Sequence, residues 1–302
     1  MKRSASARIS FISSMLIFGT IGLFVRWIPL SSGLLALSRA LIAILFLSVI
    51  LLLGRYELRP SVLRGELIWL LLSGAAMAIN WILLFEAYRY TSVSVATLSY
   101  YFAPVLVTFL SPLLFHEKMT GKKWLCFGAS TLGLILMTGV GDLKAGSSHG
   151  LGILLGLGAA CFYATVMLLN KKIKGVSGIP RTFFQFLSAA AVLLVYVLLV
   201  EDPRDLGALK APSVLLLLTV GLVHTGLAYC LYFPSMRDLP GQEIAILSYC
   251  DPLLAVLLSV FLLREPMTVW QLVGGGMILG FTCWNEWDEK KPRLRSGRGR
   301  EK

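Results

Sequence analysis

The sequence has few charged residues. Of its 302 residues, 15% are Asp, Glu, Lys or Arg, whereas soluble domains carry about 25%. Hydrophobic residues make up 57%, the mean hydropathy is +0.78, and no connection between apolar runs is long enough to fold as a soluble domain. This composition excludes a water-soluble globular protein and predicts a chain that lies almost entirely in the lipid bilayer.

Catalytic and nucleotide-binding motifs are also absent from the sequence. It contains no HExxH, no pair of acids at helical spacing, no Ser/His/Asp grouping and no GxxxxGK[ST] loop. The five cysteines lie at unrelated spacings inside apolar runs, which is atypical of a metal site or a disulfide framework. We therefore expect neither an enzyme nor an ATP-driven pump, no cofactor and no metal site.

The N-terminus lacks the cleavage site of a signal peptide. Lys2, Arg3 and Arg8 precede an apolar run, but that run ends in RWIP at positions 26–29 rather than in small residues. Arg and Trp at the end of an apolar run are typical of a membrane–water interface. We interpret this segment as a retained first span.

Long apolar runs are what the sequence has in abundance. A helical span needs about 20 apolar residues. Ten such runs predict an all-α polytopic membrane protein, with five spans on each side of a glycine-rich connection at 139–148. The predicted spans are 9–27, 33–53, 67–87, 94–115, 122–140, 150–169, 181–200, 213–234, 242–263 and 269–285.

The net charge of +12 is sorted by side of the membrane. If the N-terminus lies in the cytoplasm and the spans alternate, twenty-one lysines and arginines fall on the cytoplasmic side and six on the other. This positive-inside bias predicts a protein of the cytoplasmic (inner or plasma) membrane with both termini in the cytoplasm, and no nucleic-acid partner. The basic tail, 289–302, is expected to determine topology or to contact anionic lipid headgroups.

A segment of the first half recurs in the second half at a constant offset of 148 residues. The first copy reads ATLSYYFAPVLVTFLSPLLFHEKMTGKK from position 96, and the second reads ILSYCDPLLAVLLSVFLLREPMTVWQ from position 246. Ten of the 28 positions from Tyr101 to Gly128 are identical. The identical pairs are Tyr101/Tyr249, Pro104/Pro252, Leu106/Leu254, Leu110/Leu258, Ser111/Ser259, Leu114/Leu262, Glu117/Glu265, Met119/Met267, Thr120/Thr268 and Gly128/Gly276.

The repeat predicts two inverted halves. Five is an odd number of spans, so the second half must enter the membrane upside down relative to the first. We expect five-helix repeats at residues 1–140 and 150–288, followed by the basic tail at 289–302. Such inverted repeats usually hold the substrate path near the membrane midplane, between the halves.

Glycines at helix-packing spacing predict close contacts between spans. Gly152 and Gly156 form one such pair, and Gly276 and Gly280 form another. Gly128 is the repeat partner of Gly276, so the fifth and tenth spans are expected to play equivalent packing roles. A homodimer face is the alternative interpretation.

The repeated segments resemble the EamA-type drug/metabolite transporter superfamily. The residues that carry the resemblance are AYRYTSVSVATLSYYFAPVLVTFLSPLLFHEKMTGKKWLCFGASTLGLILMTG and LSYCDPLLAVLLSVFLLREPMTVWQLVGGGMILG. Each holds a proline-containing core and a Glu-x-Met-Thr turn, and the resemblance covers essentially the whole chain. Arg39, in LSRALIAILFL, also stands where such proteins often have an arginine early in the second span.

The resemblance implies a transporter with a central cavity. That cavity would be lined mainly by the third, fourth, eighth and ninth spans, with contributions from the first and sixth. It implies no single substrate, because the superfamily moves amino acids, drugs, sugars and other metabolites. Asp251 stands opposite Ala103 in the repeat, so its role does not follow from the family pattern. Glu117 and Glu265, in the turns, are expected to cap the next helix or to bond exposed backbone.

Polar and aromatic side chains at mid-depth predict the substrate site. Several amphipathic aromatics with an amide, an imidazole and a carboxylate describe a pocket for a small organic molecule, although any one tyrosine could simply pack. The predicted substrate-binding residues are Asn80, Trp81, Tyr100, Tyr101, His224, Tyr229, Ser248, Tyr249 and Asp251. Pro104 and Pro252 are expected to bend the fourth and ninth spans beside the pocket, with a purely structural kink as the alternative.

Three ionisable residues inside the spans are candidates for coupling or anion contact. Asp251 must be protonated, paired or wetted by a cavity. It is the candidate for proton coupling or for holding a substrate amine, with His224 as the suggested partner and Arg39 as a second one. The alternative is a neutral Asp251 that bonds a backbone carbonyl. Arg39 either recognises an anion, or it snorkels outward or pairs with a helix end. Glu86 either contacts a substrate amine or a proton, or forms a local interfacial pair.

The sequence therefore predicts a secondary transporter that moves a small organic metabolite by alternating access. An amino acid or similar zwitterion is favoured, because carboxylate and basic groups coexist with aromatics in the membrane. The expected partners are this substrate, membrane lipid and a proton as counter-ion. The alternatives are a multidrug or other metabolite exporter of the same fold, and a channel or non-transporting sensor.

Overall fold

The computed structural model describes residues 2–54, 60–115, 119–138 and 148–288, which form helices and their connections without any strand. The predicted tail and positions 139–147 of the predicted glycine-rich connection lie outside these ranges. The first half contains α1 (Lys2–Gly19), α2 (Ile21–Trp27), α3 (Ser32–Leu53), α4 (Pro60–Tyr90), α5 (Val93–Tyr100), α6 (Ala103–Phe115) and α7 (Gly121–Thr138). The second half contains α8 (Ser148–Lys172), α9 (Gly178–Val200), η1 (Pro203–Leu206), α10 (Ala211–Thr219), η2 (Val220–Leu227), α11 (Ala228–Asp238), α12 (Gly241–Ser248), α13 (Cys250–Leu257), η3 (Leu258–Leu262) and α14 (Val269–Asp288).

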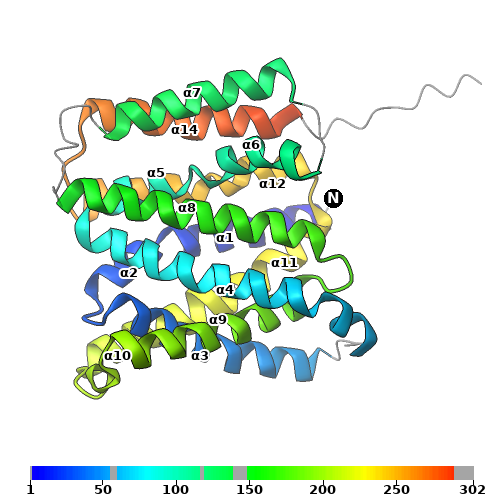
Figure 1. Ribbon diagram of the computed structural model, residues 1–302, viewed down its shortest axis with the longest axis vertical. Coiled ribbons are helices and arrows are strands. Elements are labelled where there is room, and N and C mark those ends of the chain that lie inside the picture. Colours follow the sequence, from blue (N-terminus) through cyan, green and yellow to red (C-terminus); the bar gives the residue numbers. More distant parts are fainter. Residues whose placement is uncertain (1, 55–59, 116–118, 139–147, 289–302) are drawn as a thin grey trace, which may run out of the picture.

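Long apolar helices lie side by side in a stack, with α7 and α14 at one edge and α3 at the other (Figure 1). Seven segments among the described residues are long and apolar enough to cross a membrane, and Ile246–Leu262 is a shorter apolar helix. The sequence predicts ten spans. The difference arises because α7 and α14 contain several glycines and polar residues, and because a break interrupts the helix around Tyr249. The chain is a polytopic, all-helical membrane protein.

The two halves interleave. α4 packs along α8 and α9, α1 packs along α11 and α13, and α3 packs along η2 and α9. α5 contacts both α8 and α13, and α7 packs against α14. The interior is therefore built from residues that are far apart in the sequence.

Two helix breaks fall at equivalent places in the repeat. α5 gives way to α6 after Tyr100, and α12 gives way to α13 after Ser248. Pro104 and Pro252 then lie in the first turns of α6 and α13, where a helix needs no backbone N–H donor. Each of the two repeated segments thus consists of two short helices that meet just before a proline.

Gly152 and Gly156 make the close contacts that their spacing predicts. A Cβ at Gly152 would come within 2.7 Å of the Thr91 side chain, and one at Gly156 within 2.9 Å of the Ser99 side chain. Both glycines therefore let α8 approach closely, Gly152 to the turn between α4 and α5 and Gly156 to α5 itself.

The glycines of α7 and α14 behave differently from the prediction. At Gly276 and Gly280, a Cβ would meet no atom of the described residues within 4 Å outside its own helix, so the close contacts predicted at these two glycines are wrong. Gly128, the repeat partner of Gly276, is open in the same way. The two helices instead meet at Gly133 and Gly274. A Cβ at Gly274 would come within 2.2 Å of the carbonyl oxygen of Gly133. The open face at Gly276 and Gly280 leaves the homodimer interpretation as a prediction.

Candidate functional site

A cavity of about 320 Å³ lies between the two halves. Its lining comes from α1 to α6, α8 and α11 to α13, which includes the spans that the family resemblance implies and adds α3. Most of the predicted site residues meet here. Those that line the cavity are Arg39, Asn80, Trp81, Tyr100, Tyr101, Pro104, Tyr229, Ser248, Tyr249 and Asp251.

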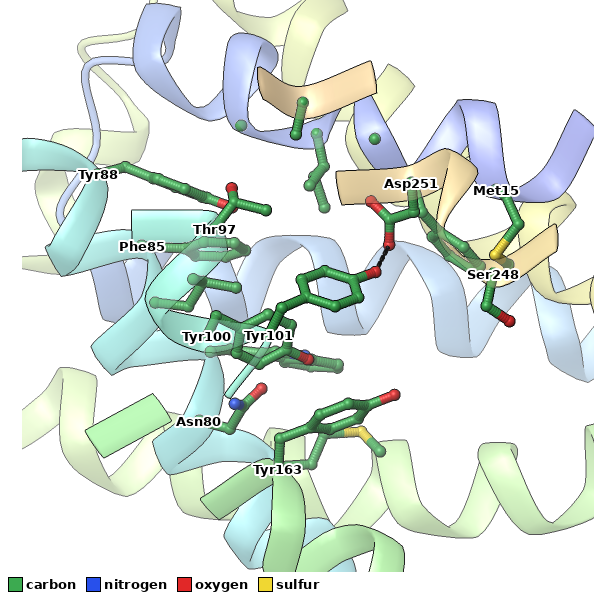
Figure 2. Close-up of a pocket in the computed structure, with 18 of the residues that line it drawn as sticks. Met15, Asn80, Phe85, Tyr88, Thr97, Tyr100, Tyr101, Tyr163, Ser248 and Asp251 are labelled. Atoms are coloured by element: carbon green, nitrogen blue, oxygen red, sulfur yellow. Dashed lines mark hydrogen bonds between the residues drawn. The ribbon is translucent and has the colours of Figure 1, made fainter. Parts of the chain in front are cut away.

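Asp251 is the only acidic residue among the described residues that line the cavity. The hydroxyl of Tyr101 donates a hydrogen bond to Asp251 Oδ2 at 2.5 Å (Figure 2). Tyr101 lies at the break between α5 and α6, and Asp251 lies in the first turn of α13. The bond therefore joins the two halves through their two helix breaks, and a hydroxyl donor of this kind stabilises a carboxylate away from bulk water.

Arg39 is the only basic residue in the same lining. It extends from α3, and only 5% of its surface is exposed. Its guanidinium carbon lies 4.4 Å from the ring centre of Trp81 and 5.3 Å from that of Phe85. Arg39 thus lies on two aromatic faces inside the protein, which differs from a side chain that snorkels to the membrane surface.

Aromatic rings form much of the remaining wall. Tyr100 lies 5.0 Å from Tyr163 and 5.8 Å from Tyr101, measured between ring centres. The Asn80 amide donates to the carbonyl of Ala159 at 2.6 Å, which ties α4 to α8. The wall therefore combines flat apolar surface with a small number of hydroxyl and amide groups, a composition typical of small-molecule sites.

His224 lies outside the cavity lining. Only 2% of its surface is exposed, and its Nε2 is 2.8 Å from the hydroxyl oxygen of Thr20. Its ring centre is 4.6 Å from that of Phe24. The predicted pairing of His224 with Asp251 therefore does not occur; the histidine instead joins η2 to the short connection between α1 and α2.

Glu86 and Pro252 are also absent from the described residues of the cavity lining. Glu86 accepts a hydrogen bond from Ser32 at 2.5 Å and lies 3.5 Å from Arg89, so it forms the local pair that the sequence allows as one interpretation. Pro252 is buried in α13 directly after Asp251. Its position affects the start of the helix rather than the wall of the cavity.

Residues 6–139 and 150–285 match the EamA-like transporter family. The chain belongs to this family. The uncharacterized transporter YxxF of Bacillus subtilis (strain 168) is 32% identical over 286 residues, which cover 92% of this chain and 88% of the relative. Protein PecM of Dickeya dadantii (strain 3937) is 28% identical, over 82% of this chain and 81% of the relative. A solved crystal structure shares the fold, with a TM-score of 0.63 and 18% identity over 92% of this chain and 96% of that one.

Membership of the EamA-like family makes this chain a membrane transporter and points away from an enzyme. Several cavity residues of this EamA-family chain were missing from the sequence prediction. Tyr88, whose hydroxyl is 3.3 Å from Thr97 Oγ1, and Tyr163 on α8 both line the cavity. The sequence shows both residues as tyrosines in or next to predicted apolar spans. It does not show which tyrosines face the same cavity.

Glu265 connects three segments next to the cavity. Its Oε2 accepts hydrogen bonds from the Val93 N–H at 2.8 Å and from the Ser259 hydroxyl at 2.5 Å, and its Oε1 lies 3.3 Å from Arg26 Nη2. Arg26, Val93 and Ser259 each lie four residues from a residue that lines the cavity. Glu265 thus accepts a hydrogen bond from a backbone N–H, which is one of the two roles that the sequence predicts. The backbone belongs to the first turn of α5 in the other half, and a negative charge is favourable at the start of a helix.

Glu265→Gln is expected to lower the free energy of unfolding by about 1–2 kcal/mol, because it removes one ion pair and weakens two hydrogen bonds to a carboxylate. Glu86→Gln is the matched control. Glu86 forms a half-exposed pair with Arg89, so its replacement is expected to change stability by about 0.5 kcal/mol or less. Thermal unfolding of the two purified variants measures the difference, and equal losses would contradict a structural role specific to Glu265.

Proposed function

We propose that this EamA-family chain is a secondary transporter that moves a small organic metabolite, an amino acid or similar zwitterion, by alternating access. The observation that carries the proposal is the cavity that holds Asp251 and Arg39 among aromatic rings. A zwitterion presents one cationic and one anionic group, which these two side chains complement. A volume of about 320 Å³ lies at the small end of known ligand cavities.

We further propose ten spans arranged as inverted repeats, at residues 1–140 and 150–288. The helix contacts support this arrangement, because a contact between two helices has a counterpart between the repeat partners of those two helices. Contacts of α4 with α8, α4 with α9 and α6 with α8 correspond to those of α11 with α1, η2 with α3 and α13 with α1. The pairs α7–α14 and α3–α9 correspond to themselves, as expected across a pseudo-twofold axis.

Cysteines at Thr120 and Thr268 are expected to react with a membrane-impermeant thiol reagent from opposite sides of the membrane. The two residues are repeat partners, and both are exposed. Thr120 is expected to label from the cytoplasm, because Lys122 and Lys123 follow it and cytoplasmic loops are rich in lysine. Intact cells and inside-out vesicles, with the five native cysteines replaced, supply the measurement.

Labelling of both cysteines from the same side would contradict the inverted repeat. Ser177→Cys is the control, because Ser177 is exposed just before α9 and is expected to label from the same side as Thr120. The same experiment tests the proposed cytoplasmic termini, since the alternation of spans fixes both.

A thermal-shift screen of the purified protein against a metabolite library would identify the substrate, because a ligand of the folded state raises its apparent stability. Substrate counterflow in proteoliposomes then tests transport. Exchange of labelled for unlabelled substrate requires a binding site that alternates between the two sides, so its absence would favour the channel or sensor alternative. The aromatic wall also fits the second candidate, an exporter of apolar drugs, and strong responses to organic cations without a carboxylate would favour it.

A further inference from the structure

Arg39 is a buried cation without a counter-ion among the described residues. No carboxylate there lies within ion-pair distance of its guanidinium, and its Nε is buried without a hydrogen-bond partner. An uncompensated charge taken out of water is disfavoured by several kcal/mol. Its persistence in α3 therefore requires a compensating interaction.

The aromatic neighbours supply part of that compensation. Trp81 and Phe85 interact with Arg39 through their ring faces, at 4.4 and 5.3 Å, and such contacts contribute about 2 kcal/mol when desolvated. This is less than the cost of burying the charge. Contacts with ring faces leave the guanidinium N–H donors available to a flat, doubly accepting partner.

We propose that Arg39 binds the carboxylate group of the transported molecule. This inference deepens the proposed function and rests on it. A carboxylate has the fork geometry that pairs with two parallel guanidinium N–H donors. The carboxylate of a zwitterion also leaves the site neutral, because Arg39 carries the one positive charge among the described lining residues and Asp251 carries the one negative charge. A dianionic phosphate would leave excess negative charge in the same cavity.

The test compares two probes of the same shape, isovalerate and isovaleramide, in thermal-shift titrations of the purified protein. Isovalerate is expected to stabilise the wild-type protein, and the neutral amide is not. Arg39→Met is expected to weaken the apparent isovalerate affinity by at least about tenfold, because it removes a charge-assisted pair of hydrogen bonds, which is stronger than a neutral pair. Arg39→Lys keeps the positive charge but loses the two parallel N–H donors, so its isovalerate affinity is expected to lie between those of the wild-type protein and Arg39→Met. Arg89→Gln, outside the cavity, is expected to retain wild-type affinity.

The unliganded stability of Arg39→Met separates a binding role from a structural one. Removal of an unpaired buried charge is expected to leave the melting temperature unchanged or higher. A lower melting temperature with unchanged isovalerate affinity would overturn the proposal. So would an equal response to isovaleramide, a stronger response to inorganic phosphate, or no response of the wild-type protein to isovalerate.

Counterflow distinguishes the failure of this inference from the failure of the proposed function. Isovalerate binding that depends on Arg39, together with absent counterflow, would leave the carboxylate site in place and refute transport by exchange. The opposite result is active counterflow in Arg39→Met at wild-type substrate affinity. It would leave the transporter proposal in place and overturn the role of Arg39.

Discussion

Asp251→Asn is expected to abolish proton-driven accumulation of the substrate in proteoliposomes while the protein still folds. Asparagine has nearly the same shape as aspartate, but it neither binds a proton in the physiological range nor carries the charge that receives the Tyr101 hydrogen bond. Loss of a charge-assisted contact in a desolvated site costs about 2 kcal/mol or more, and 1.4 kcal/mol corresponds to a factor of ten. We therefore expect substrate affinity to fall at least about tenfold if Asp251 also holds the substrate amine.

The measurement is uptake as a function of external pH, with and without an imposed proton gradient. Tyr101→Phe keeps the carboxylate and removes only its donor, so it is expected to retain a pH dependence that Asp251→Asn lacks. Glu86→Gln removes a carboxylate outside the cavity lining and is expected to leave the profile unchanged. Uptake by Asp251→Asn with the pH dependence, rate and affinity of the wild-type protein would refute the coupling role.

Gly274→Ala is expected to lower the melting temperature by roughly 5 °C. The new methyl group would lie 2.2 Å from the carbonyl oxygen of Gly133 and 2.6 Å from the backbone nitrogen of Met137. Neither neighbour is a flexible side chain, so α7 and α14 must separate. Overpacking of this kind costs about 1–3 kcal/mol, and each kcal/mol shifts the melting temperature by about 2–4 °C in a chain of 150–250 residues.

The two following residues of α14 provide the controls. A Cβ at Gly276 would meet no atom of the described part of the chain within 4 Å beyond its own helix, and alanine has the higher helix propensity, so Gly276→Ala is expected to be neutral or stabilising. At Gly275 the nearest atom is the end of the Leu98 side chain, at 2.5 Å, which can move, so an intermediate effect is expected. A smaller loss at Gly274 than at Gly276 would contradict the packing of α7 on α14 described above.

The 148-residue repeat and the apolar runs predicted the helices, because they are long-range patterns that do not depend on local detail. The set of spans that line the cavity followed from the family resemblance, and α3 was not among them. The pairs Tyr101/Tyr249 and Pro104/Pro252 stand out only when the halves are compared, and the structure has its helix breaks just before both prolines. Mid-span polar and aromatic residues on the third, fourth and ninth predicted spans were then sufficient to predict Asn80 and its neighbours as lining.

Helix rotation was harder to predict. His224 lies in η2, a π-helical segment in which backbone bonds span five residues, as the Thr225 side chain also does when it donates to the carbonyl of Val220. This wider turn shifts the angular position of each following side chain around the helix. The depth of His224 in the membrane could therefore be predicted from the sequence, but the side of the helix on which it lies could not. The same limit applies to Gly276 and Gly280: their spacing permits a close neighbour, but α7 approaches the face that carries Gly274.

Asp251 has one further consequence, because the first half carries Ala103 at the equivalent position. In the proposed inverted arrangement, two identical halves would give the inward-facing and outward-facing conformations equal free energies, since exchange of the halves converts one conformation into the other. Ala103 is fully buried and carries no charge, so the carboxylate belongs to one half alone and removes this degeneracy. A ligand or proton changes the balance between two conformations only through its different affinity for each. In the proposed arrangement, the occupancy of this single carboxylate is therefore one of the differences between the halves that determine which of the two conformations is favoured.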